Sequence, residues 1–138
     1  MANILIAVTG SIASYKAADL VSSLKKQGHD VTVLMTEAAR EFIQPLTLQV
    51  LSQNPVHLDV MKEPYPDQVN HIELGKRTDL FIVVPATANT IAKLAHGFAD
   101  NMVTSTALAL PSHIPKLLAP AMNTKMYDHP ATQANLKT

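Results

Sequence analysis

The feature that most constrains the fold is a strand, turn, helix and strand pattern at the start of the chain. In residues 3–8, a continuous apolar run follows Asn3, which is typical of a strand buried on both faces of a sheet. Thr-Gly-Ser at 9–11 interrupts this run. Apolar residues then recur every three or four positions over Ile12–Gln27, which predicts a helix that ends at Gly28. Asp30–Met35 follows as a second strand, so the unit crosses over right-handed into a parallel sheet.

The rest of the chain continues this alternation of helices and strands. We expect helical pieces at 36–42 and 45–51, a short strand at 56–58, a helix at 71–77, a strand at 79–84, helices at 87–94 and 101–110, a short strand at 116–119, and a last helix that starts at Pro130. The pattern predicts an α/β fold: a doubly wound parallel sheet of about five strands in a Rossmann- or flavodoxin-like three-layer sandwich. Because no linker or internal repeat is visible, residues 1–138 are expected to form a single domain.

Composition excludes several classes of function. The formal net charge is zero, which argues against a nucleic-acid binder, because such proteins carry a basic face. The sequence contains no cysteine, which excludes disulfide scaffolds and thiol nucleophiles within these residues. The first residues lack a basic segment, and the apolar run after them is too short for a signal peptide or a membrane span. We therefore expect a cytoplasmic protein that binds neither membrane nor nucleic acid.

Small or polar residues follow four of the expected strands, at 9–11, 36–37, 85–90 and 120–123. Ligands of open parallel sheets bind beyond the carboxyl ends of the strands, so these segments are expected to line one edge. The dinucleotide and Walker A fingerprints are both missing. The acidic residue expected to bind a ribose after the second strand is replaced by Thr36, and the neighbouring Glu37 is a candidate for that role.

Two of these segments precede helices and could seat an anion. Gly10 and Ser11 offer backbone N–H groups and a hydroxyl to a phosphate, but ordinary N-capping by Ser11 explains them equally well. The stretch 86–90 combines small residues, which allow close approach of the backbone, with three polar side chains. This density favours a phosphate or ribityl contact over a plain helix cap. Asp100 and Asn101 could support that contact, or merely cap the next helix.

The six histidines show no metal-ligand spacing. His71 opens a predicted helix after the proline-rich loop, where its charge could be tuned for acid or base chemistry. The other five are interpreted as structural. Neither a serine–histidine–acid order nor a G-x-S-x-G elbow supports a hydrolase.

Four segments, collinear over nearly the whole chain, resemble the flavin-containing cysteine decarboxylases. Residues 6–13 (IAVTGSIA) are similar to the flavin-phosphate turn of that family, and residues 70–72 (NHI) to the segment that holds its catalytic histidine. Residues 85–91 (PATANTI) resemble its P-A-[ST]-A-N-T motif, and residues 120–127 (PAMNTKMY) resemble its P-x-M-N-x-x-M-[WY] motif. One such motif would be weak evidence, but four in order are strong evidence.

The resemblance implies FMN as the cofactor, decarboxylation of 4′-phosphopantothenoylcysteine to 4′-phosphopantetheine in coenzyme A biosynthesis, and a homotrimer or higher homo-oligomer. It also implies His71 as the catalytic acid or base and Asn123 as the residue that holds the substrate carboxylate. The positions implied to lie near FMN are Gly10, Ser11, Ile12, Thr36, Thr87, Ala88, Asn89, Thr90 and Ala121.

The sequence departs from the family in one respect. The family carries a cysteine in a later segment that clamps the substrate, and a sixth strand, and neither is found in these 138 residues. We therefore expect that a C-terminal segment is missing from this sequence.

Three alternatives on the same scaffold stay open. They are a peptidyl-cysteine decarboxylase of lantibiotic maturation, a flavin prenyltransferase, and a non-enzymatic flavoprotein that regulates a partner. The two decarboxylases share the histidine and the P-x-M-N motif, so the sequence barely separates them. Asn123 in that motif argues against the prenyltransferase, and the presence of His71 without an acidic tail argues against the regulator.

Overall fold

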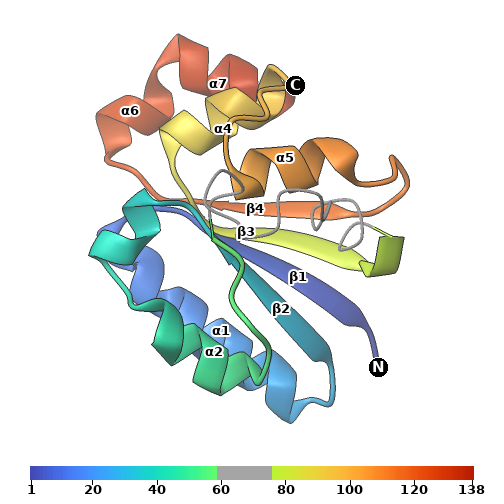
Figure 1. Cartoon of the computed structure of the whole chain (residues 1–138). Coiled ribbons are helices and arrows are strands. Elements are labelled where there is room, and N and C mark those ends of the chain that lie inside the picture. The colour runs from blue at the N-terminus through green and yellow to red at the C-terminus, as the bar shows by residue number, and fades with distance from the viewer. Residues whose placement is uncertain (59–75) are drawn as a thin grey trace.

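A computed structural model describes residues 1–58 and 76–138 of the chain (Figure 1). In this part of the chain, no helix combines the length and the apolar character needed to cross a membrane. The elements in chain order are β1 (Asn3–Val8), η1 (Ile12–Ser14), α1 (Tyr15–Lys26), β2 (Asp30–Met35), η2 (Ala38–Glu41), α2 (Pro45–Ser52), β3 (Leu80–Ala86), α4 (Ala88–Ala95), α5 (Met102–Ala109), β4 (Lys116–Pro120), α6 (Thr124–Asp128) and α7 (Pro130–Lys137), where η marks a 3₁₀ helix.

The four strands of the described residues form one parallel sheet in the order β2-β1-β3-β4. The chain passes from β1 to β2 on one side and later returns to β3 on the other side of β1. A topological switch point therefore lies between β1 and β3, the place where open α/β sheets bind ligands. The predicted doubly wound parallel sheet is confirmed.

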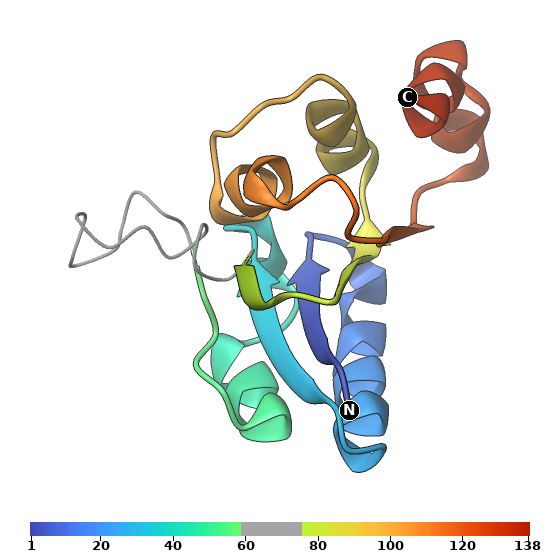
Figure 2. The same cartoon turned by 90° about the vertical axis from the view of Figure 1, so that its right-hand side faces the viewer.

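Both faces of the sheet are covered, because apolar residues of β1 point alternately to opposite sides. Ile4, Ile6 and Val8 belong to a core that they share with residues of α1 and α2. Leu5 and Ala7 belong to a second core, which includes residues of α4 and α5. Figures 1 and 2 show these two pairs of helices on opposite sides of the sheet. The continuous apolar run of β1 is thus explained by a three-layer sandwich.

The described sheet has four strands, close to the five predicted. At the expected strand 56–58, only His57 pairs, through a single parallel bridge to Leu34. The N–H of His57 donates to the Val33 carbonyl at 2.9 Å, and its own carbonyl accepts from the Met35 N–H at 3.0 Å. Pro55, two residues earlier, has no N–H to donate, which limits pairing on that side.

Two predicted helices are shorter or tighter than expected. The helix predicted from Ile12 begins as the 3₁₀ turn η1 and becomes an α-helix only at Tyr15. The segment 36–42 holds only η2. In η1, hydrogen bonds between Ser11 and Ser14 tighten the first turn, a common feature of helix starts.

Strand β4 is the edge of the described sheet, next to β3. All five of its residues are exposed, including Leu117 and Leu118. The well-covered part of the sheet is therefore β1, β2 and β3, and the rigid support for a ligand site lies there.

Candidate functional site

A cavity of about 350 Å³ opens where the carboxyl ends of β1, β2 and β3 come together. This is the switch point of the sheet, as predicted for the ligand site. Its lining residues come from the turns after the three strands and from the starts of η2, α4 and α5. They are Gly10, Thr36, Glu37, Ala38, Thr87, Asn89, Thr90 and Asn101.

A second cavity, of about 360 Å³, lies beside β4. Its lining is mainly apolar and includes Phe81, Leu94, Phe98 and Leu118. None of the predicted site residues that the structure describes lines it, and it offers few groups that could orient a polar ligand. The cavity at the switch point is therefore the candidate site.

Gly10 allows two turns of the candidate site to meet. A Cβ atom at this position would lie 2.7 Å from the Cβ of Ala38 and 2.9 Å from its carbonyl carbon. Both separations are shorter than Cβ contacts tolerate, so only glycine lets the turn after β1 pack against η2. The requirement for glycine here is thus a packing requirement, in addition to the predicted approach of a cofactor.

Thr9 connects the ends of β1 and β3, and the sequence analysis did not single it out. Its buried hydroxyl donates to the carbonyl of Pro85 and accepts from the N–H of Thr87 at 3.1 Å. The Ser14 hydroxyl in turn donates to the Thr9 carbonyl at 2.9 Å. A threonine that ends an otherwise apolar strand is the sequence signal that could have found it. These bonds hold the turn after β1 against the start of α4.

The start of α4 presents hydrogen-bond donors to the cavity. Thr87 caps the helix, because its hydroxyl accepts from the Thr90 N–H at 3.2 Å. The same hydroxyl donates to the Thr90 hydroxyl at 3.2 Å. By helix geometry, the N–H groups of Ala88 and Asn89 have no acceptor inside the helix and are free to bind an anion. Thr87 can therefore cap the helix while the N–H groups of Ala88 and Asn89 bind a ligand. From the sequence alone, these two roles are alternatives.

Ser11 and Ile12 lie next to the cavity in sequence but are not among its lining residues. The Ser11 hydroxyl accepts from the N–H of Ala13 at 3.1 Å, so Ser11 is the N-cap of η1. The side chain of Ile12 is 84% exposed. The capping function of Ser11 is thus present, and the cofactor contacts of Ser11 and Ile12 stay predictions.

The P-A-M-N segment is joined to β3 but does not line the cavity. The N–H of Ala121 donates to the Ala86 carbonyl at 3.0 Å. Asn123 caps α6, because its Oδ1 accepts from the Met126 N–H at 2.9 Å. This bond leaves the Nδ2 amino group of the exposed Asn123 directed away from α6, as a donor suited to a carboxylate. The binding roles of Ala121 and Asn123 stay predictions, and His71 lies outside the described residues.

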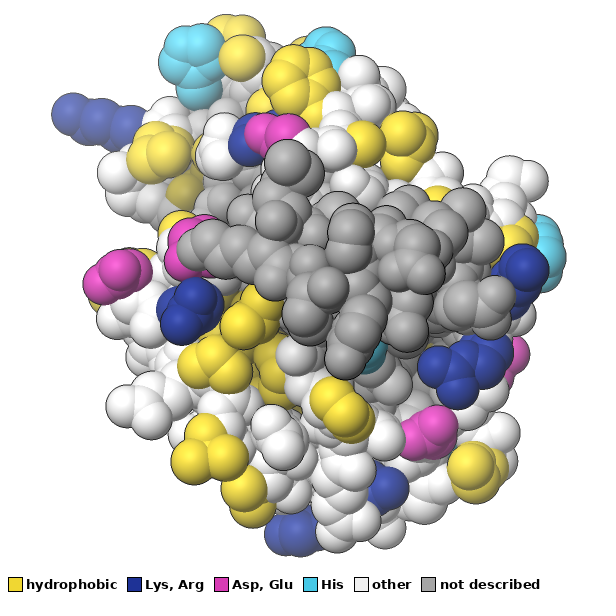
Figure 3. Space-filling view, in the orientation of Figure 1, with side chains coloured by type: hydrophobic (Ala, Val, Ile, Leu, Met, Phe, Trp, Pro, Cys, Tyr) yellow, Lys and Arg dark blue, Asp and Glu magenta, His cyan; other side chains and the backbone are white. Residues whose placement is uncertain are grey.

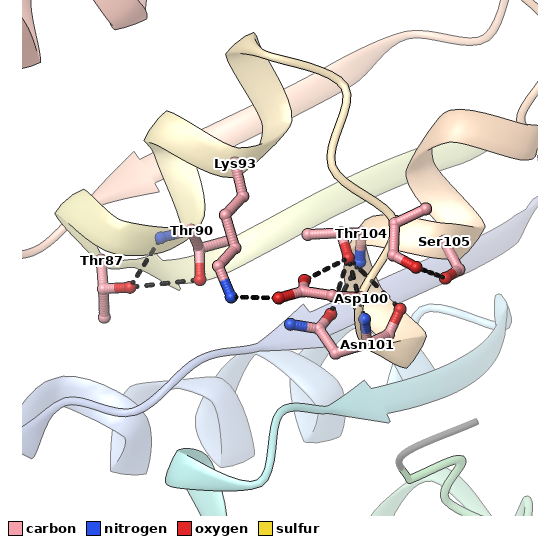
Figure 4. A network of polar contacts seen from close by, with 8 residues as sticks. Thr87, Thr90, Lys93, Asp100, Asn101, Thr104 and Ser105 are labelled. Atoms are coloured by element: carbon pink, nitrogen blue, oxygen red, sulfur yellow. Dashed lines mark hydrogen bonds and ion pairs between the residues drawn. The ribbon is translucent and has the colours of Figure 1, made fainter. Parts of the chain in front are cut away.

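A network of polar contacts joins α4 to the start of α5 (Figure 4). The Lys93 ammonium lies 2.7 Å from a carboxylate oxygen of Asp100. Its hydrogen bond and positive charge hold the pKa of the Asp100 carboxyl below the usual 3.8. Asn101 caps α5 by accepting from the Thr104 N–H at 2.9 Å. The network fixes one wall of the cavity, because Asn101 lines it.

The lining groups define what the cavity can bind. Among the described residues, the lining offers hydroxyls from Thr36, Thr87 and Thr90 and amides from Asn89 and Asn101, and its one carboxylate is Glu37. No lysine or arginine is among these described lining residues. Such a site suits an oxygen-rich ligand that is held by hydrogen bonds and helix N–H groups, including a phosphate ester.

Comparisons with known proteins identify the family of the chain. A model of the flavoprotein family matches residues 1–138. A Streptococcus mutans protein named "Probable phosphopantothenoylcysteine decarboxylase" is 65% identical over 133 residues, which cover 96% of this chain and 74% of that protein. The Bacillus subtilis coenzyme A biosynthesis bifunctional protein CoaBC is 50% identical over 134 residues. That match covers 97% of this chain but only 32% of the longer bifunctional protein.

The fold has close neighbours among solved structures. The crystal structure of TvaF, an FMN-dependent cysteine decarboxylase from thioviridamide biosynthesis, superposes with a TM-score of 0.90 at 29% sequence identity. The match covers 99% of this chain and 83% of that one. The family model spans the whole chain, and the Streptococcus mutans relative is 65% identical over the 133 matched residues. The chain therefore belongs to the flavoprotein family, among the flavin-containing cysteine decarboxylases that include phosphopantothenoylcysteine decarboxylase.

Proposed function

We propose that this chain binds FMN and decarboxylates the cysteine moiety of 4′-phosphopantothenoylcysteine, yielding 4′-phosphopantetheine for coenzyme A biosynthesis. The observation that carries the proposal is the 65% identity to a protein with this name, in a chain where residues of two predicted flavin motifs, among them Gly10 and Thr87, border one cavity. Gly10 and Thr36, from the turns after β1 and β2, and Thr87, Asn89 and Thr90, from the start of α4, all line that cavity. A cytoplasmic location is part of the same proposal.

The donor set of the cavity fits a phosphorylated flavin. The unpaired N–H groups at the start of α4 and the hydroxyls of Thr87 and Thr90 are suited to phosphate and ribityl oxygens. Because Gly10 has no side chain, its backbone borders the cavity directly. When bound, the flavin supplies the redox chemistry at the substrate thiol, which no side chain of the protein can supply.

Two residues of the chain are assigned to the substrate. The Asn123 amide holds the carboxylate by a neutral hydrogen bond, which binds it without the charge that would oppose its loss as CO₂. His71 accepts or donates a proton, because its usual pKa lies near neutral pH. Holding the carboxylate and moving the proton are therefore divided between separate motifs of the chain.

A second candidate substrate is a peptide that ends in cysteine. The similarity to TvaF, with a TM-score of 0.90, supports this alternative. The 65% identity to the phosphopantothenoylcysteine decarboxylase outweighs the 29% identity to TvaF and favours the small substrate. Parallel assays of the two substrates distinguish them, and turnover of the peptide alone would reject the primary proposal.

The first experiment is an absorbance spectrum of the purified protein with added FMN, recorded without oxygen before and after addition of 4′-phosphopantothenoylcysteine. We expect flavin bands that bleach or shift when the substrate is added. Flavin bands that do not change when the substrate is added would support flavin binding but contradict the proposed substrate. Absence of bound flavin even after addition of FMN would reject the proposal as a whole.

Substitutions at the two substrate residues test the mechanism. His71→Asn is expected to retain bound flavin and to abolish CO₂ release, since the proton-transfer group is lost while the described residues that line the cavity are kept. Asn123→Asp is expected to repel the substrate carboxylate and to block turnover while sparing flavin binding. Normal turnover by either variant would remove that residue from the mechanism.

We also propose that the chain acts as a homotrimer or a higher homo-oligomer. Support comes from large hydrophobic side chains on the surface, including Phe42, Leu46 and Val50 near and on α2 and Leu108 on α5. Figure 3 shows hydrophobic side chains exposed over the lower part of one face, where α2 lies. Exposed apolar surface of this kind marks interfaces in many proteins. Light scattering after size exclusion tests this proposal, and a monomeric mass would contradict it.

A further inference from the structure

Asn101 is the one cavity-lining residue that comes from the start of α5, and neither the flavin motifs nor the comparisons assign it a role. Its sequence context leaves two explanations, a helix cap or a ligand contact. The structure shows how one side chain can do both.

Three of the four hydrogen-bonding groups of Asn101 are engaged within the protein. Its backbone N–H donates to the Thr104 hydroxyl at 3.2 Å, and its carbonyl accepts from the Ser105 N–H at 2.9 Å. Its side-chain oxygen accepts from the Thr104 N–H at 2.9 Å. Because a backbone N–H can only donate, this last bond assigns Oδ1 to the helix and places the Nδ2 amino group on the other side of the amide.

The Nδ2 amino group has no acceptor among the residues that the structure describes. Asn101 is only partly buried and lines the cavity together with Gly10 and Thr36, so a bound ligand can reach it. An amino group can only donate, so its natural partner is an acceptor oxygen. Asn123 is arranged in the same way: its Oδ1 accepts from the Met126 N–H, three residues further along, and its Nδ2 is not used in the cap.

The preceding residue, Asp100, is anchored to α4, whose first residues also line the cavity. One Asp100 carboxylate oxygen lies 2.7 Å from the Lys93 ammonium on α4, and the other accepts from the Thr104 hydroxyl at 3.4 Å. The Ser105 hydroxyl also donates to the Ala99 carbonyl at 3.1 Å. Figure 4 shows this chain of contacts between Lys93 and the start of α5. The ion pair therefore couples the position of Asn101 to the helix that carries Thr87 and Thr90.

We propose that Asn101 is a further flavin-binding residue, which donates Nδ2 to an acceptor oxygen of the cofactor, and that Lys93 and Asp100 are its positioning pair. The inference rests on the proposed flavin function. The acceptor is either a phosphate oxygen or an oxygen of the riboflavin part, and either one can accept a hydrogen bond from Nδ2. A purely structural role for Asn101 would require only the cap bond from Oδ1.

Two substitutions at Asn101 separate the ligand contact from the cap. Serine and aspartate both keep a side-chain oxygen that caps a helix, but both remove the Nδ2 donor. We expect Asn101→Ser to weaken FMN binding about tenfold, the size of one hydrogen bond to a ligand. Asn101→Asp is expected to weaken it further, because its charge repels the phosphate. Fluorescence quenching of FMN gives the dissociation constant. The melting temperature of the flavin-free protein shows whether the helix cap is kept, because loss of the cap would lower it.

The positioning pair is tested with variants of Lys93. Lys93→Met is expected to weaken FMN binding several-fold without contacting the ligand, and Lys93→Arg is expected to restore it because the ion pair can re-form. The matched control is Lys26→Met on α1, another lysine-to-methionine change outside the network and the cavity. Loss of affinity in Lys26→Met equal to that in Lys93→Met would overturn the positioning role.

Comparing the affinities for FMN and riboflavin shows which part of the cofactor carries the acceptor oxygen. The same measurements distinguish failure of the Asn101 inference from failure of the proposed function. A loss in Asn101→Ser that appears with FMN but not with riboflavin places the acceptor on the phosphate, whereas equal losses place it on the riboflavin part. Both results support the inference. Unchanged FMN affinity in both Asn101 variants, with wild-type protein that binds FMN, overturns the inference alone. Wild-type protein that binds no flavin overturns the proposed function, and the inference with it.

Discussion

At the scale of single residues, Gly10 packs so closely against Ala38 that there is no room for a side chain at residue 10. Because a Cβ at residue 10 would lie 2.7 Å from the Ala38 Cβ, we expect Gly10→Ala to lower the free energy of unfolding by about 1–3 kcal/mol. Ala38→Gly in the same chain should recover part of the loss, since it removes the nearest atom. Urea denaturation of the two single variants and the double variant measures the coupling. Strictly additive effects would show that the clash is relieved elsewhere.

The Lys93–Asp100 pair predicts a specific titration. The pKa of Asp100 is lowered in the folded chain, so the pair stabilises the fold above the usual value of 3.8 and this contribution is lost as pH falls through the lowered pKa. Carbon-13 NMR of the aspartate carboxyl groups should show a midpoint below 3.8 for Asp100. Lys93→Met should move that midpoint upward, because the main cause of the shift is removed. An unchanged midpoint in this variant would mean that Lys93 does not hold the carboxylate in solution.

At the scale of elements, helix ends carry much of the site, and one helix end is strained. Helix α2 ends at Gln53, which adopts the left-handed conformation with φ of 63°. Glycine adopts this conformation without the steric cost of a Cβ, so Gln53→Gly should raise the free energy of unfolding by about 0.5–1 kcal/mol.

The matched control for this prediction is Gln49→Gly. Both glutamines are exposed, but Gln49 lies inside α2, where glycine should destabilise the protein by about 1 kcal/mol. Thermal denaturation of both variants gives the comparison. If the two changes shift the melting temperature in the same direction, the conformation of Gln53 does not govern the end of the helix.

Helices and strands are also where sequence patterns succeed and fail most clearly. The apolar runs of β1 and β3 identify buried strands because both faces are covered, so every side chain in the run is apolar. The same pattern predicted a strand at residues 56–58, but there only His57 pairs with the sheet. It also could not distinguish the 3₁₀ turns η1 and η2 from α-helices, because the periods of 3.0 and 3.6 residues are hard to separate over one turn.

At the scale of the whole molecule, the site is assembled from all three covered strands, so ligand binding should stabilise the entire fold. We expect FMN at one hundred times its dissociation constant to add about 2.7 kcal/mol to the free energy of unfolding. For a chain of this size, this corresponds to a rise of roughly 10 °C in the melting temperature. Thermal melts across a series of FMN concentrations measure it.

The control for this prediction is Asn123→Asp. Because Asn123 does not line the cavity, its variant should show the same rise with FMN as the wild-type protein. A melting temperature that is independent of FMN in the wild-type protein would contradict flavin binding in the folded state. A rise that disappears only in Asn123→Asp would instead place Asn123 at the flavin.

The sequence by itself determined the α/β class, the parallel sheet and the family. Periodicity distinguishes buried strands from amphipathic helices, and the four motifs are contiguous, so each can be read locally. It also identified most of the cavity lining, because Gly10, Thr36 and Thr87 directly follow strands whose carboxyl ends meet at one edge.

Only the tertiary structure decided which residues hold that site together. Thr9 and Pro85 are 76 positions apart, yet they share a hydrogen bond because β1 and β3 are neighbours in the sheet. The role of Asn101 likewise depends on an ion pair from another helix and on which of its amide atoms the cap consumes. Such contacts follow from strand order and side-chain packing, which local patterns do not specify, because many arrangements of the same strands and helices share the same periodicities.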